Sequence, residues 1–151
     1  MDERTKLVHE EDEAWAEIVA LISGLTEQQM EEPGLTPAGW SVKDLLWHFC
    51  RWTAEAARQL ERIRMGTYVE QDWDTDTDAL NDRFFRESQG MDIAIVKTQL
   101  AAARSRALAE WAALPELTPE AVEWFGESGS LHDREHLPDL RAWVKKLTSG
   151  A

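Results

Sequence analysis

SVKDLLWHFCRWTAEAARQLERIRM, residues 41–65, is the stretch that decides the fold. Ser41 followed three residues later by Asp44 forms a capping box, in which each side chain satisfies a backbone amide that the start of a helix leaves unpaired. The apolar residues after it recur at helical spacing and form one stripe, so a helix is predicted from Ser41 to about Met65, before Gly66. The stripe consists of Val42, Leu45, Leu46, Phe49, Ala56, Leu60 and Ile63.

Three other segments have the same periodicity, at about Glu3 to Ser23, Asp92 to Leu114 and Ser130 to Leu147. Their inward residues are predicted to be Val8, Trp15, Ile18, Val19 and Ile22 in the first, Ile93, Val96, Leu100, Ala103, Ala107 and Trp111 in the second, and Leu140, Trp143, Val144 and Leu147 in the third. Pro138 lies inside the last segment. Because proline removes a backbone hydrogen bond, this helix is expected to be kinked there or to start there.

The connecting segments differ in length. Residues 25–40 contain two prolines and should form at most one short helical turn. Residues 66–91 form a long acidic connection with a short helix near 78–88, and residues 118–128 give another short turn of helix. β-Branched residues form no alternating runs. The whole chain, residues 1–151, is therefore expected to be one all-α domain, a four-helix bundle with a long connection between the second and third helices.

Composition and charge exclude several classes of protein. The 151 residues include 16 Lys and Arg against 29 Asp and Glu, a net charge of −13 that repels phosphate, so neither nucleic acid nor an anionic membrane is an expected partner. The single cysteine, Cys50, cannot form an internal disulfide, and the charged N-terminus does not suit a secretory signal. No apolar run approaches the roughly 18 residues of a membrane span. A cytoplasmic location is expected.

Two histidines stand four residues apart near the C-terminus. On a helix His132 and His136 lie about 40° apart on the inward stripe. Because a buried imidazole needs a polar partner, the pair is expected either to bind a divalent metal or to bond carboxylates such as Asp133, Glu135 or Asp139.

A third histidine strengthens the metal hypothesis. His48 borders the stripe of the helix predicted from Ser41, about 60° from Leu45, and can face a groove between helices. Three imidazoles leave a fourth coordination position open, which is the pattern of catalytic zinc. Asp44 is expected mainly to cap the helix, or else to orient His48. Trp52 is expected to line a pocket beside the metal or to pack in the core.

Other residues are weaker candidates. Cys50 lies about 200° around the helix from His48 and is interpreted as a buried structural thiol. His9 stands among acidic residues and is expected on a solvated face. A calcium loop is suggested by four alternating aspartates, but the glycine and the bidentate glutamate it requires are missing, so a solvated acidic loop is predicted. These four residues are Asp72, Asp74, Asp76 and Asp78.

Two segments resemble a known family. GWSVKDLLWHFCRW, residues 39–52, resembles the second helix of the DinB-like superfamily, and LHDREHLPDLRAW, residues 131–143, resembles the last helix of its maleylpyruvate-isomerase-type members. Members are four-helix bundles, many of them dimers, that hold a divalent metal with one histidine of the second helix and a pair on the last. The resemblance therefore implies a homodimer with His48, His132 and His136 as metal ligands.

The resemblance also implies a function. Characterised relatives include S-transferases that use mycothiol or bacillithiol, and mycothiol-dependent maleylpyruvate isomerase, which carries an additional C-terminal domain. Because this chain stops soon after Trp143, the isomerisation itself is not expected. The leading hypothesis is an enzyme that uses zinc or nickel to join a low-molecular-weight thiol to a small electrophile in detoxification or stress response.

Two alternatives remain open. The first is a metal-dependent hydrolase that uses water in place of the thiol. The second is a non-catalytic bundle that binds a ligand or partner, in which Glu135 or Asp139 closes the fourth coordination position.

Overall fold

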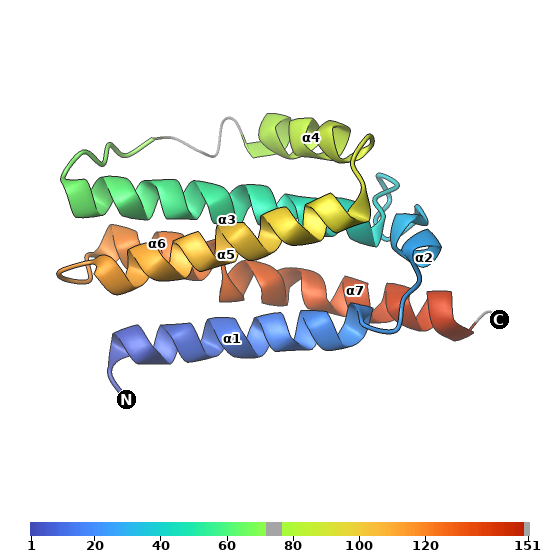
Figure 1. Cartoon of the computed structure of the whole chain (residues 1–151), viewed down its shortest axis with the longest axis horizontal. Helices are drawn as coiled ribbons and strands as arrows, with labels where there is room; N and C mark the ends of the chain where they lie inside the picture. Colours follow the sequence, from blue (N-terminus) through green and yellow to red (C-terminus); the bar gives the residue numbers. More distant parts are fainter. Residues whose placement is uncertain (72–76, 150–151) are drawn as a thin grey trace.

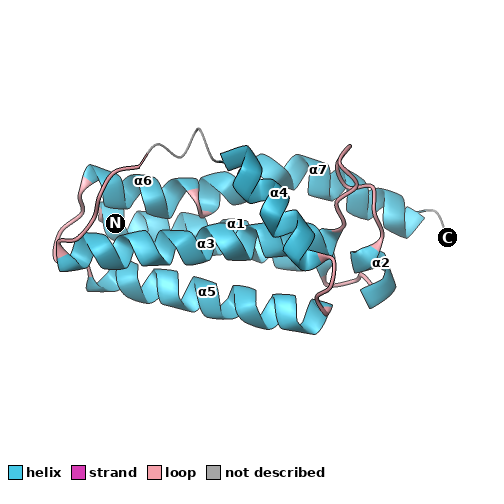
Figure 2. Ribbon diagram, turned by 90° about the horizontal axis from the view of Figure 1, so that it is seen from above, coloured by secondary structure: helices cyan, strands magenta, loops and turns pink. Residues whose placement is uncertain are grey.

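A computed structural model describes residues 1–71 and 77–149, which form seven helices and no strand (Figures 1 and 2). The predicted all-α class is confirmed, but the count of four helices is not, because three shorter helices accompany four of at least 20 residues. Asp72, Asp74 and Asp76 of the acidic run lie outside the described residues. The helices are α1 Glu3–Ile22, α2 Glu27–Glu31, α3 Val42–Met65, α4 Thr77–Ser88, α5 Ile93–Ala113, α6 Pro119–Glu127 and α7 Ser130–Ser149.

The predicted bounds of α3 are confirmed at both ends. The Asp44 amide donates to Ser41 Oγ at 3.2 Å, and the Ser41 amide donates to Asp44 Oδ2 at 2.8 Å, which completes the capping box. At the other end Gly66 adopts a left-handed conformation with φ of 75°, which a residue with a side chain adopts only at a cost. The helix that carries His48 therefore begins and ends where its local sequence dictates.

The four long helices run along the long axis of the molecule, with α3 beside α5 and α1 beside α7 (Figure 1). Their apolar stripes meet in a core that includes Ile18, Leu46 and Phe49, and a second cluster near the other end of α3 includes Leu60. The prediction was wrong for Val19, which is 42% exposed. Val19 is rotated about 100° from the fully buried Ile18, so it falls outside the stripe.

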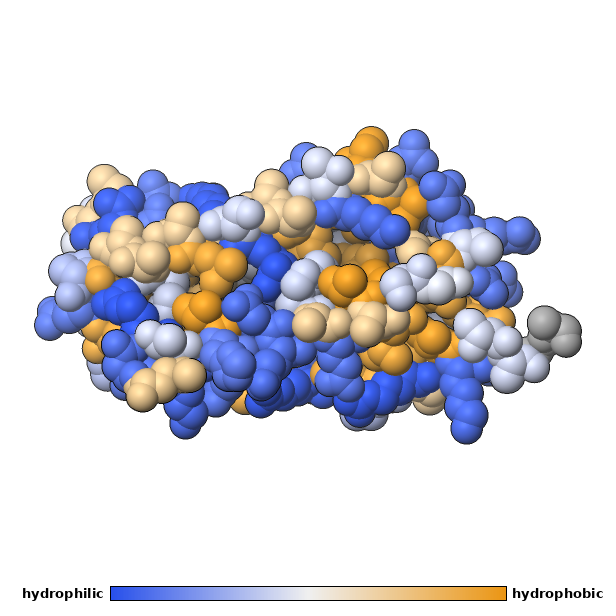
Figure 3. All heavy atoms as spheres, turned by 60° about the horizontal axis from the view of Figure 1, so that its bottom comes forward, coloured by the Kyte–Doolittle hydropathy of each residue, from blue (hydrophilic) through white to orange (hydrophobic). Residues whose placement is uncertain are grey.

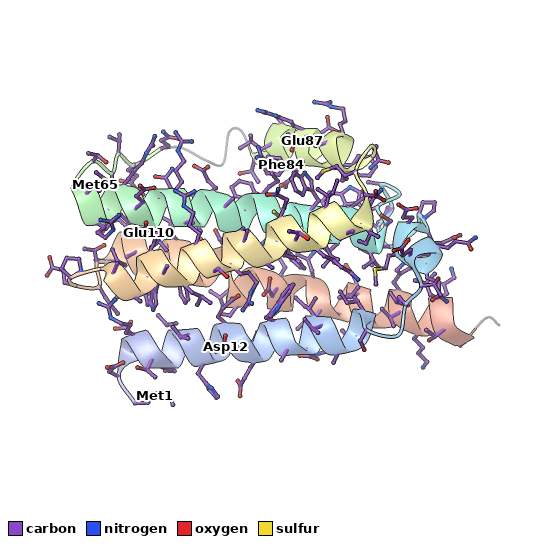
Figure 4. All side chains as sticks on the ribbon, in the orientation of Figure 1. Met1, Asp12, Met65, Phe84, Glu87 and Glu110 are labelled. Atoms are coloured by element: carbon purple, nitrogen blue, oxygen red, sulfur yellow. The ribbon has the colours of Figure 1, made fainter. Side chains whose placement is uncertain are left out.

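Helix α4 lies across α3, so the long connection between α3 and α5 is attached to the helix before it (Figures 2 and 4). Glu87 Oε1 accepts a hydrogen bond from Trp47 Nε1 at 3.2 Å and lies 3.3 Å from Arg51 Nε. The Arg51 guanidinium also lies over the Phe84 ring, 4.7 Å from its centroid. These contacts hold α4 against the N-terminal half of α3, the half that contains His48.

The segment before the last helix is more helical than predicted. Helix α6 has nine residues, and it begins with Pro119 after Thr118, whose Oγ1 accepts from the Ala121 amide at 3.2 Å. Helix α7 starts at Ser130 and continues through Pro138, so the alternative in which it starts at the proline was wrong. Pro138 is exposed.

Figure 3 shows hydrophobic residues interspersed with polar ones over both halves of the face that it draws. Among the described helices none is both long and apolar enough to cross a bilayer.

Candidate metal centre

The structure brings together the three histidines that the sequence singled out. His48 comes from α3, and His132 and His136 come from consecutive turns of α7. The Nε2 atoms of His48 and His132 lie 2.8 Å apart, and those of His132 and His136 lie 3.2 Å apart. One nitrogen from each ring lies within 4.8 Å of the other two. The three rings therefore point to one small volume.

Aromatic side chains surround the three imidazoles. The Phe49 ring meets His132 edge to face at 5.3 Å and His136 at 5.5 Å between centroids. The Trp40 ring lies 5.0 Å from His48, whose side chain is only 4% exposed. Phe49 follows His48 in the sequence, so the register of α3 places both residues at the site.

Burial keeps the rings neutral. It lowers the pKa of His48 to about 2 and that of His132 to about 3, and the neighbouring imidazoles add to both shifts. Burial also lowers the pKa of His136, although Glu135 and Asp139 oppose this shift. Each ring then keeps a nitrogen lone pair at neutral pH, which is the form that binds a metal.

The donor set and its spacing fit a divalent transition metal. Two zinc–nitrogen bonds of about 2.0–2.1 Å at a tetrahedral angle place the nitrogens about 3.3 Å apart. The separation of His132 from His136 matches this value at 3.2 Å, whereas His48 and His132, at 2.8 Å, would move slightly apart. The Nδ1 atoms of His48 and His132 are buried without a hydrogen-bond partner among the described residues. The cluster could hold a metal ion.

Asp44 does not contact His48 through a hydrogen bond. Its Oδ1 accepts from Ser88 Oγ at 2.6 Å and from Gln89 Nε2 at 2.9 Å, and its Oδ2 accepts from Ser41. The carboxylate thus caps α3 and joins it to the end of α4. The alternative role for Asp44, orienting His48, has no hydrogen bond to support it in the described structure.

A cavity of about 700 Å³ opens beside the cluster and is lined by all three histidines and by Trp52. Trp52 Nε1 donates to Asn81 Oδ1 of α4 at 2.8 Å, and its ring meets the Phe84 ring edge to face at 5.7 Å. These contacts fix Trp52 between α3 and α4. Of the two roles considered for Trp52, the structure shows it at the wall of the cavity.

Residues that the sequence analysis missed form the opposite side of the cavity. They come mainly from α6 and from the segment after α3: Tyr68, Glu70, Glu120, Glu123, Trp124 and Glu127. The spacing of the glutamates around Trp124 could have indicated this side of the cavity, because they share one face if residues 119–127 form a full helix. The sequence analysis expected only a single turn there, so the shared face was overlooked.

The two weaker candidates lie away from the cluster. Cys50 is buried, and burial raises the pKa of its thiol to about 11, as suits a structural thiol. His9 lies on an exposed face, where its Nε2 is 3.0 Å from Glu13 Oε1. Both residues are placed as predicted.

Comparison with known proteins identifies the family. The family model described as the mycothiol maleylpyruvate isomerase N-terminal domain matches residues 12–145, a range that includes α3 and the histidine pair of α7. No curated protein and no solved structure gives a significant match. The chain belongs to the mycothiol maleylpyruvate isomerase N-terminal domain family, a DinB-like family.

Proposed function

We propose that this protein is a metal-dependent transferase that joins a low-molecular-weight thiol, of the mycothiol or bacillithiol type, to a small electrophile. His48, His132 and His136 would hold the ion, zinc or nickel. One observation carries this proposal: three neutral imidazoles, one buried and two half-buried, converge at the edge of a cavity of about 700 Å³. The description of the matching family favours mycothiol as the thiol.

The chemistry needs a thiolate at neutral pH. A divalent ion at the three histidines would lower the pKa of a thiol from its usual value of about 8.5. The thiol sulfur then forms a bond to the electrophilic carbon, the leaving group departs with its bonding electron pair, and the thiol proton passes to water. The reaction is a substitution at carbon, so it needs neither an oxidant nor a reductant.

The residues of the chain position the reactants. His132 and His136 are held one helical turn apart by α7, and His48 is held opposite them by α3. Trp40 and Phe49 pack against the rings and exclude water from their outer faces. The side of the cluster that faces the cavity is left to the thiol and the electrophile, with Trp52 as one wall.

The first test is metal content. Wild type, His132→Ala and, as a matched control, His9→Ala are purified without a metal-affinity tag and analysed by inductively coupled plasma mass spectrometry. We expect about one zinc or nickel ion per chain in wild type and in His9→Ala, and none in His132→Ala. Stoichiometric metal in His132→Ala, or none in wild type after reconstitution, would contradict the proposal.

The second test is thiol dependence. Consumption of an electrophile such as monobromobimane is followed with and without mycothiol on the same three proteins. We expect conversion faster than the uncatalysed reaction of the thiol with the electrophile only in the two proteins that keep the metal, and no conversion without thiol. Conversion without thiol would replace the transferase with a hydrolase, and bound metal without any conversion would favour a binding bundle.

A further inference from the structure

The charged side chains that line the cavity are all acidic. Five glutamates line it, Glu70, Glu120, Glu123, Glu127 and Glu135, and no lysine or arginine does so among the described residues. None of the five forms an ion pair within the described part of the chain, whereas carboxylates elsewhere do. Glu110, for example, lies 2.8 Å from Arg64. Within the described residues, no basic side chain that lines the cavity compensates these five carboxylates.

Helix α6 keeps two of these carboxylates, Glu123 and Glu127, against its own stability, whereas Glu120 lies in its first turn, where a negative charge is favourable. Glu120, Glu123 and Glu127 follow one another at spacings of three and four residues, where like charges repel on a helix. Glu127 is also the last residue of α6, at the negative end of the helix dipole. Partial burial, and then the charge of Glu123, raise the pKa of Glu127. Glu123 and Glu127 are exposed, and like charges kept side by side where they line a cavity favour a ligand of opposite charge.

A second metal ion does not account for these carboxylates. Within the described residues, the three histidines are the only group whose ligand atoms converge closely enough to hold an ion. The glutamates surround a wider space, which suits a larger cation.

Aromatic rings lie on the same wall. Trp124 and Tyr68 both line the cavity, and Trp124 Nε1 donates to the Tyr68 hydroxyl at 3.3 Å. Carboxylates combined with aromatic faces bind organic ammonium groups, because the ring quadrupole and the negative charge both attract a cation. His48 also lines the cavity and is only 4% exposed. Its buried Nδ1 has no hydrogen-bond partner in the described structure.

We propose that the cavity accepts a small molecule that carries a positively charged nitrogen, held by the carboxylates of Glu123 and Glu127 and by the ring of Trp124. The reactive group of this molecule would face the three histidines, and that part rests on the proposed function. The preference for a cation rests on the cavity alone and does not require a metal.

Three probes of similar size and different charge test this preference. Benzylamine is cationic at pH 7, benzyl alcohol is neutral and benzoate is anionic. Their affinities are measured by titration calorimetry and by tryptophan fluorescence, on protein treated with a chelator and on protein loaded with zinc. A cation beside one unscreened carboxylate gains about 1 kcal/mol, which is about a fivefold change in affinity. On the chelator-treated protein we expect benzylamine to bind at least about fivefold more tightly than benzyl alcohol, and benzoate to bind most weakly; on the zinc-loaded protein benzoate can also coordinate the metal.

A matched pair of variants locates the effect. Glu123→Gln/Glu127→Gln removes two exposed charges that line the cavity, and Glu32→Gln/Glu116→Gln removes two exposed charges outside it. We expect the cavity variant to lose about fivefold or more of its benzylamine affinity, to keep its affinity for benzyl alcohol, and to melt no lower than wild type. The control should change benzylamine binding less than twofold.

The possible results separate this inference from the proposed function. On the chelator-treated protein, equal binding of benzylamine and benzyl alcohol, tighter binding of benzoate, or an equal loss in the control variant would overturn the cation preference, whatever the outcome of the metal analysis. If the chain holds no metal but benzylamine still binds selectively to the chelator-treated protein, the proposed transferase fails and the cation preference stands.

Discussion

At the scale of single residues, two kinds of buried group make stability depend on pH in opposite directions. The pKa of His132 is lowered to about 3 by burial and then by His136. The pKa of Asp133 is raised to about 8 by burial and then by Glu11, against the effect of Arg104. A histidine with a depressed pKa stabilises the fold above about pH 6.5 and loses that contribution as the pH falls. An aspartate with a raised pKa contributes most below about pH 3.8, and this contribution is lost as the pH rises to about 8.

These signs give a prediction for the metal-free protein. The free energy of unfolding of wild type, His132→Gln, Asp133→Asn and the control His9→Ala is measured by urea denaturation with a chelator at pH 5, 6, 7 and 8. Relative to His132→Gln, wild type should lose about 2 kcal/mol between pH 7 and pH 5, because the unfolded histidine takes up a proton that the folded one excludes. Relative to Asp133→Asn, wild type should gain stability as the pH falls from 8 to 5.

The control should follow wild type, because His9 lies exposed beside Glu13. Profiles for His132→Gln and Asp133→Asn that run parallel to wild type would show that neither residue has the pKa shift described. The comparison uses differences between variants because the two contributions partly cancel in wild type itself.

At the scale of elements, the junction of α3 and α4 depends on one carboxylate. Asp44 caps α3 and accepts hydrogen bonds from Ser88, which is fully buried, and from Gln89. Its replacement removes half of the capping box and leaves the buried Ser41 amide unpaired. Ser88 and Gln89 keep the Phe85 carbonyl as acceptor. Asp92 offers a contrast, since it precedes α5 as N-cap but makes no capping hydrogen bond with its side chain.

Asp44→Ala is therefore expected to lower the free energy of unfolding by about 2 kcal/mol, the combined cost of losing half of the capping box and of leaving the buried Ser41 amide unpaired. Asp92→Ala should cost less than about 0.5 kcal/mol. Both variants should keep the metal when folded, because Asp44 makes no hydrogen bond to His48. Urea denaturation measures the free energy of unfolding, and metal analysis measures the metal content. A folded Asp44→Ala protein without metal would instead assign Asp44 the role of orienting His48.

The sequence predicted the elements whose signals are local. The capping box of Ser41 and Asp44 and the apolar period after it located α3 to within a residue, and the spacing of His132 and His136 placed both on one face of α7. The histidine cluster was within reach because its members stand on long helices with clear periodicity. Two helices with known apolar faces can pack in only a few ways, and this restricts where the three histidines can lie relative to one another.

The parts that the sequence did not predict depend on contacts between distant residues. Helix α6 is too short to be stable alone, and it is held by Phe125, whose ring stacks on Trp111 of α5 at 4.2 Å between centroids. Asp44 and its partner Ser88 are separated by 44 residues. No local pattern indicates either pairing, so the attachment of α4 was missed, and without a full helix at residues 119–127 the spacing of its glutamates could not be interpreted.

At the scale of the whole molecule, the core consists of two clusters of buried residues that share helices. Helix α3 contributes Leu46 to the first cluster and Leu60 to the second, and α5 contributes Leu100 and Trp111 in the same way. Loss of packing in one cluster therefore displaces helices that form the other. This sharing is the physical basis for expecting residues 1–151 to unfold as one domain.

Damage to either cluster should then lower the stability of both. Leu46→Ala in the first and Phe125→Ala in the second are each expected to reduce the free energy of unfolding by about 3 kcal/mol, because each leaves a cavity, and to lower the Tm by roughly 6–12 °C. Leu131→Ala, at a side chain that is 56% exposed, serves as control and should change the stability by less than about 0.5 kcal/mol. Far-UV circular dichroism and tryptophan fluorescence should report one coincident transition in all four proteins. If Phe125→Ala instead gave two separated transitions, the end of the molecule that contains α6 would be an independent unit, and the cavity between α6 and the histidines would lie at a boundary between two domains.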